Sequence, residues 1–80
     1  MRKKKVGIMI HKDVMLEFGT KVKFYRSEKG LSQEQLGVLT NLSQTYISEV
    51  ENGHRNISII NMYTLAQALD VKLVDLVNFE

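Results

Sequence analysis

The sequence predicts an all-α fold, a compact five-helix bundle that contains a helix-turn-helix. Apolar residues recur at helical spacing in successive segments, and residues that favour helix starts and stops separate those segments. The chain has 80 residues and no proline, so nothing interrupts these patterns. Alternation typical of a strand occurs only at Val6, Ile8 and Ile10. A chain of this length forms one small domain.

The first helix is expected from about Val14 to Lys29, with Asp13 as a possible N-cap and Gly30 just past its end. Its apolar residues are spaced three and four apart, as one helical face requires. They are Met15, Phe18, Val22 and Tyr25.

A second, short helix follows at once. Ser32 and Gln35 have the spacing of a capping box, which opens a helix that we expect to end near Thr40. Asn41 tolerates the left-handed backbone that a tight turn needs. Ser43 then caps a third helix, so two short helices stand three residues apart.

The third helix is expected over Gln44 to Asn52, with Gly53 as its stop. Only Ile47 and Val50 need to face the core. We therefore expect most of the polar side chains of this helix to face outward, toward a binding partner. Ser58 caps a fourth helix whose inward face we expect to comprise Ile59, Met62, Leu65, Ala66 and Leu69.

A fifth short helix is expected from about Lys72 through Val77. We expect Leu73 and Leu76 to close the core of the monomer. The same end of the chain carries more apolar residues than an exposed last turn requires, and we expect them to form a homodimer interface, with closure of the monomer's own core as the alternative. They are Val74, Val77 and Phe79.

The distribution of charge is uneven. The net charge is +2, yet residues 1–12 carry five cations and no acid, so the remaining residues sum to −3. We expect residues 1–12 to be a basic extension, disordered in the free protein, and 13–80 to be the folded domain. A short edge strand is the alternative for the extension. Its apolar run is too short for a signal peptide, and we expect a cytoplasmic protein with no membrane contact.

The stretch from Phe18 to Leu76 resembles the DNA-binding helix-turn-helix domain of the phage repressor, Cro and Xre family. The resemblance is carried by linked features: "GLSQ", a small residue, a turn, "LS", "IS", "ENG" and "LAQAL". "TYIS" and "RNISI" also resemble controller proteins of restriction–modification systems, with prophage or accessory-gene repressors as the alternative. Gly37 stands where the family usually has alanine, and Asn41 where it has glycine.

The resemblance implies a transcriptional regulator whose third helix enters the major groove of a double-stranded operator. Gln44 is the best base reader, because its amide can pair with adenine through both a donor and an acceptor. The expected base contacts are Gln44, Thr45, Tyr46 and Ser48, and the expected phosphate contacts are Gln33, Asn52, Arg55 and Asn56. For each, a solvated surface residue is the alternative. The resemblance also pairs Arg26 with Glu51 as a structural salt bridge.

No enzyme is expected. The sequence offers no nucleophile with a base, no converging carboxylates and no cysteine, so we expect no catalytic residues, no metal and no cofactor. No small-molecule ligand is evident. The expected partners are a palindromic DNA operator and a second copy of the chain, because one such domain contacts only a few base pairs. A protein-interaction module without DNA binding is the rival interpretation.

Overall fold

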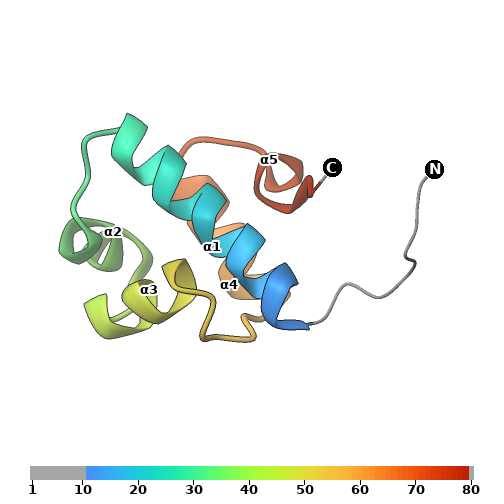
Figure 1. Cartoon of the computed structure of the whole chain (residues 1–80). Coiled ribbons are helices and arrows are strands. Elements are labelled where there is room, and N and C mark those ends of the chain that lie inside the picture. Colours follow the sequence, from blue (N-terminus) through green and yellow to red (C-terminus); the bar gives the residue numbers. More distant parts are fainter. Residues whose placement is uncertain (1–10, 80) are drawn as a thin grey trace.

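A computed structural model describes residues 11–79, and these residues form helices joined by short turns, with no strand among them. The helices are α1 (His11–Glu28), α2 (Gln33–Thr40), α3 (Gln44–Glu51), α4 (Ile59–Ala68) and α5 (Leu73–Val77). Figure 1 shows their order in space. The predicted all-α, five-helix architecture is therefore confirmed. The predicted extension 1–12 lies almost wholly outside the described residues, and its role stays a prediction.

The start of α1 differs from the prediction. The helix begins at His11, so Asp13 lies within the first turn instead of capping it. The positive end of a helix stabilises a carboxylate at either position, and for that reason the position of Asp13 does not fix the boundary. The end of α1 is close to the prediction: the helix ends at Glu28, one residue earlier than expected, and Gly30 has a left-handed φ of 70° two residues later.

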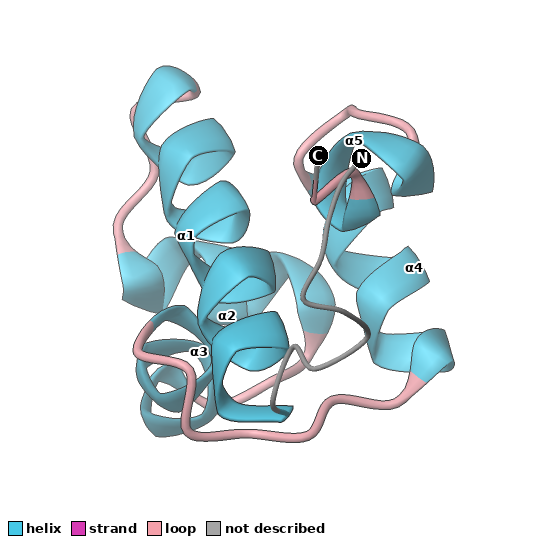
Figure 2. Ribbon diagram, turned by 45° about the vertical axis from the view of Figure 1, so that its right-hand side comes forward, coloured by secondary structure: helices cyan, strands magenta, loops and turns pink. Residues whose placement is uncertain are grey.

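The long helix α1 crosses the molecule and organises the others around it. It packs against α3 and α5, while α2 packs against α3 and α4, and α4 packs against α5. In Figures 1 and 2, α2 and α3 lie together at one end, and α5 lies at the opposite end. In the helix-turn-helix, α3 thus packs on α1 and α2 packs on α4.

One cluster of buried side chains joins all five helices. It comprises Phe18, Val22, Leu36, Ile47, Val50, Leu65, Ala66, Leu69 and Leu76. Each helix contributes at least one member, and Leu36, Ile47, Leu65 and Leu76 are completely buried. Removing such a side chain would cost about 2–5 kcal/mol. The packing of this cluster therefore fixes the angles between short helices that would be unstable alone.

A close approach of two backbones sets the distance between α1 and α3. Gly19 lies on the buried face of α1, where a Cβ atom would stand 2.0 Å from the carbonyl oxygen of Val50. No real Cβ tolerates that separation, so only glycine allows this packing. At the end of α3, Gly53 has a φ of 75° and lies against the backbone of Leu16.

One predicted core position is wrong. Ile59 continues the apolar periodicity of α4, but its side chain is 64% exposed. Apolar periodicity can continue to the end of a helix even where no neighbouring helix packs against that end. The periodicity therefore cannot show which residues of the face are buried. The other predicted residues of that face are buried or half-buried. In α5, Leu76 is buried as predicted and Leu73 is half-buried.

Candidate nucleic-acid interface

The turn between α2 and α3 has the tight geometry that the sequence predicts. The backbone N–H of Gln35 donates to the Ser32 hydroxyl at 3.0 Å, and the Gln35 side chain accepts from the backbone N–H of Ser32 at 2.8 Å. Asn41 ends α2 with a left-handed φ of 59°. Ser43 then caps α3 by accepting from the N–H of Tyr46 at 3.0 Å. The left-handed residue that ends α2 and the cap that begins α3 therefore fix the path of the short turn between them.

Gly37 of α2 lies close against the turn that leads into α3. A Cβ at this position would lie 2.5 Å from the carbonyl oxygen of Leu42 in the turn. The N–H of Leu42 donates back to the carbonyl of Gly37 at 3.0 Å, which closes the turn. The absence of a side chain at Gly37 therefore sets the approach of α3 to α2.

The orientation of α3 follows from which of its residues are buried. Ile47, Val50 and Glu51 face inward. Because successive residues turn by about 100°, the opposite side of the helix is formed by the remaining positions. That outward face together with the exposed first residue of the helix, hereafter the reading face, comprises Gln44, Thr45, Ser48, Glu49 and Asn52. All five are polar, and Asn52 also forms the C-cap, with its N–H donating to the Ser48 carbonyl at 3.0 Å.

A buried ion pair joins α3 to α1. Arg26 Nε donates to Glu51 Oε2 at 2.6 Å, and Arg26 Nη2 donates to Glu51 Oε1 at 3.0 Å. The two side chains are only 12% and 2% exposed. The hydrogen bonds to Glu51 raise the pKa of Arg26 above its ordinary value, despite the opposing effect of burial. Arg26 also donates to the carbonyl of Leu31 at 2.7 Å, so this pair links α1, α3 and the chain entering α2.

Two glutamines extend this network to the surface. Gln33 Nε2 donates to Glu51 Oε1 at 3.0 Å, and the Gln33 oxygen lies 3.5 Å from Gln44 Nε2. Gln33 is half-buried while Gln44, at the first position of α3, is exposed. The outermost contact is long, so the Gln44 amide is oriented by the network yet free to exchange partners.

A second group of contacts surrounds the loop after α3. Arg55 Nε donates to Glu49 Oε1 at 2.7 Å, and the guanidinium carbon lies 4.8 Å from the centre of the Tyr46 ring. The Tyr46 hydroxyl accepts from Asn61 Nδ2 at 3.1 Å. The cluster of Glu49, Arg55, Tyr46 and Asn61 thus connects α3, the loop and α4.

The structure brings most of the predicted contact residues to one region. Thr45, Asn52, Arg55 and Asn56 are exposed, and Ser48, Tyr46 and Gln33 are half-buried. His54 is exposed in the same loop. Gln33 and Gln44 lie at the N-terminal ends of α2 and α3, where free backbone N–H groups favour anions.

Three contributors were not predicted as parts of the site. Asn61 fixes Tyr46, Glu49 holds Arg55, and Gly19 allows α3 to approach α1. Glu49 could have been found, because it lies one helical turn from Thr45 and near a cation along the chain. Nothing in the sequence marks Gly19 or Asn61, since their partners are far away along the chain.

The predicted interface residues of α5 differ in exposure. Val74 is 58% exposed, whereas Val77 and Phe79 are half-buried and pack against the core. Val77 and Phe79 line a small apolar cavity of about 230 Å³ beside the start of α1. Of the three, only Val74 is largely exposed to solvent.

Two kinds of feature are missing from residues 11–79. No cluster of histidine and carboxylate side chains there could hold a metal ion. No helix in that range is long and apolar enough to cross a membrane.

The chain is similar to known regulators over most of its length. Residues 22–76 match the model of the helix-turn-helix family. Control protein C.MunI of Mycoplasma sp is 40% identical over 65 residues, which cover 80% of this chain and 88% of the relative. The restriction-modification controller protein C.AhdI from Aeromonas hydrophila has a structure with a TM-score of 0.75 and 42% identity, covering 78% of this chain and 94% of that one.

A structure of SinR, a master regulator for biofilm formation, in complex with DNA is also similar. The TM-score is 0.71 at 32% identity, and the match covers 74% of this chain and 95% of the chain in that structure. In view of these matches and of the α2–turn–α3 geometry, the chain belongs to the helix-turn-helix family and is a DNA-binding transcriptional regulator of the controller-protein type.

Proposed function

We propose that this protein binds a palindromic operator as a homodimer, with α3 of each subunit in the major groove, and controls restriction–modification genes. The observation that carries the proposal is the polar reading face of α3, which a buried ion pair from α1 holds at a fixed angle. The eight residues of α3 extend about 12 Å at 1.5 Å per residue, which matches a groove about 12 Å wide. The controller-protein relatives support the choice of regulated genes.

Base reading is assigned to the start of α3. Gln44 is exposed, and its amide is oriented by Gln33 without being held tightly. It can pair bidentately with adenine, while Thr45 offers a hydroxyl and a methyl group to neighbouring bases. Tyr46 and Ser48 are further candidates. Tyr46 is half-buried and held by Asn61, so it suits a contact at the groove edge more than a deep one.

Phosphate contacts are assigned to the surroundings of α3. The N-terminal end of α2 and the Gln33 side chain face one flank, and Asn52, Arg55 and Asn56 lie in the loop at the other. Arg55 is the only cation between Lys29 and Lys72, so it is the strongest member of this group. The basic extension at residues 1–12 would add charge along the backbone.

The remaining parts of the proposal follow from the chemistry of the site. Polar amides and hydroxyls on an exposed helix suit recognition of base edges, and we propose a cytoplasmic binding protein without catalytic activity, cofactor or small-molecule ligand. Two half-sites about 34 Å apart would be read by the two subunits. The homodimer would form through α5, with Val74 as the most exposed contact.

Selection from a pool of random duplexes tests this proposal. Repeated rounds of binding and amplification should yield one motif with two-fold symmetry and half-sites one helical turn apart. Footprinting on that motif should protect both halves. Recovery of no motif, with binding indistinguishable from that of a scrambled duplex, would instead favour a protein-interaction module that reuses the fold.

A further inference from the structure

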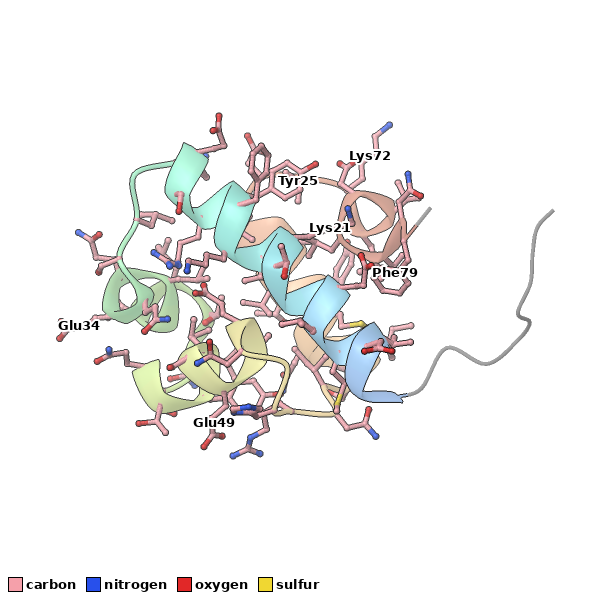
Figure 3. All side chains as sticks on the ribbon, in the orientation of Figure 1. Lys21, Tyr25, Glu34, Glu49, Lys72 and Phe79 are labelled. Carbon is pink, nitrogen blue, oxygen red and sulfur yellow. The ribbon has the colours of Figure 1, made fainter. Side chains whose placement is uncertain are left out.

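Glu49 is an acid on the face of α3 that would meet DNA. It lies one helical turn from Thr45 on the reading face, and Figure 3 shows it at the edge of α3 that points away from the body of the molecule. A carboxylate there faces a polyanion, which is electrostatically unfavourable. No acid is needed at that position for folding, because the Glu49 side chain is 40% exposed.

The partner of Glu49 is the cation that the proposed function assigns to phosphate. Arg55 Nε lies 2.7 Å from Glu49 Oε1, and the two side chains are 48% and 40% exposed. The backbone supports the same contact, since the N–H of His54 donates to the carbonyl of Glu49 at 2.8 Å. In the free protein, Arg55 is therefore already neutralised by an acid of the reading face.

A pair this exposed contributes little to folding, because solvent and salt weaken it. It does, however, create a competition. The carboxylate occupies the Arg55 Nε, so a phosphate group that binds the guanidinium edge containing Nε must displace it, and a bidentate arginine–phosphate contact is strong enough to do so when it is well aligned. The Tyr46 ring, which lies against the guanidinium, keeps Arg55 within reach of either anion.

The alignment depends on how α3 is seated. Base contacts in a cognate groove fix the depth of the helix and bring one phosphate to a defined place, whereas a random duplex offers no such contacts. We propose that Glu49 restrains DNA binding by holding Arg55: the seated operator complex breaks the pair at a cost in affinity, whereas a random duplex leaves the pair intact. This inference rests on the proposed function of the same face.

The experiment compares four proteins: wild type, Glu49→Gln, Arg55→Ala and the double variant. Their affinities are measured by fluorescence anisotropy, across a salt series, for the selected operator and for a scrambled duplex of equal length and composition. Glu34→Gln is the matched control in the wild-type and Arg55→Ala backgrounds. Glu34 is an exposed acid near the start of the neighbouring helix α2. Its substitution by glutamine removes the same charge and leaves the contacts of Arg55 unchanged. Circular dichroism checks that each variant is folded.

Glu49→Gln should tighten binding to the operator by about two- to fivefold per subunit, because the operator complex no longer has to break one exposed ion pair. The salt slope on the operator should stay nearly constant, because Arg55 already contacts phosphate there. Binding to the scrambled duplex should tighten by no more than that, while its salt slope steepens by about one per subunit, as expected for one more phosphate contact. Glu34→Gln should not change the difference between the two salt slopes, and in the Arg55→Ala background the two glutamine variants should behave alike.

Two results would overturn the inference. If Glu49→Gln and Glu34→Gln change the affinities and the salt slopes of both duplexes equally, Glu49 acts only through net charge. If Glu49→Gln weakens operator binding and leaves scrambled binding untouched, the carboxylate accepts a hydrogen bond from a base, as it can from cytosine N4. A wild-type protein with no preference for any sequence is a different outcome, because it defeats the proposed function itself and this inference with it.

Discussion

Individual side chains at the surface of α3 divide into those that the fold holds and those that it leaves free. Glu51 is buried and accepts hydrogen bonds from both Arg26 and Gln33. Gln44 has one long contact and is otherwise exposed. The rigid pair sets the position of the helix and the loosely held amide can adapt to a base, so the two kinds of residue should give different phenotypes when they are substituted.

Gln44→Ala should reduce affinity for the operator by about 1–3 kcal/mol and relax preference at one position per half-site, because a bidentate base contact is lost. Affinity for a scrambled duplex should barely change. Anisotropy titrations on operators with single base changes measure both effects. The matched control is Gln67→Ala, which removes an exposed glutamine from α4. An unchanged ratio of operator to scrambled affinity would show that Gln44 does not read a base.

Arg26→Met should destabilise the fold by about 3–5 kcal/mol, since it leaves the Glu51 carboxylate buried without its cation. That is a large share of the roughly 4–12 kcal/mol expected for a domain of this size. Arg26→Lys should cost less, because an ammonium keeps the charge but not the two parallel hydrogen bonds. Urea unfolding followed by circular dichroism measures both. Equal losses for the two variants would mean that the buried charge is not the important feature.

At the scale of helices, local chemistry made much of the fold predictable. Ser32, Ser43 and Ser58 each cap a helix by accepting from a backbone N–H, and each was readable because the cap and its helix are adjacent in the chain. Asn41 takes the left-handed φ that the turn between short helices requires. Boundaries that depend on such nearby residues follow from the sequence.

Contacts between distant segments were harder to predict. The Arg26–Glu51 pair was reached only through family resemblance, because nothing in spacing links residues 25 positions apart. The exposure of Ile59 depends on where neighbouring helices end. The Glu49–Arg55 pair crosses a loop whose path the sequence does not specify. The parts of the site that the sequence missed are those set by tertiary packing.

The closeness of α1 and α3 yields a prediction at this scale. Gly19→Ala should destabilise the protein by about 1–3 kcal/mol or more, although alanine favours helices, because its Cβ would meet the Val50 carbonyl. Moving α3 away from α1 should also weaken operator binding. Thr20→Ala, at the next and exposed position of α1, is the control and should be neutral or slightly stabilising. Thermal unfolding compares the two. A neutral Gly19→Ala would show that this approach is not tight.

The molecule has two ends, and the proposed function gives them different roles. One end holds α2 and α3, and the other holds α5, as Figures 1 and 2 show. A dimer formed through α5 would leave the reading faces of both subunits uncovered. This separation allows the two properties, dimerisation and DNA reading, to be altered by independent substitutions.

Val74→Glu is the substitution that isolates dimerisation. Val74 is 58% exposed, so a charge there should leave the monomer folded, but it would bury an unpaired carboxylate in an α5 interface. We expect the dimer Kd to rise by about tenfold or more, corresponding to ~1.4 kcal/mol. Sedimentation at micromolar concentrations measures the dimer fraction. Val77→Glu would be a poorer test, because Val77 lines a cavity of the monomer and a charge would also disturb the core.

The control for Val74→Glu is Val38→Glu, which places the same charge on a valine of α2 that is 78% exposed. It should not change the dimer fraction. If both variants lower that fraction equally, the cause is net charge and not the position of Val74. If neither does, or if the wild-type protein sediments as a monomer with and without operator DNA, α5 is not the interface. Because α5 lies at the end opposite α3, Val74→Glu should retain the base preference of each half-site while losing the cooperative binding of the two.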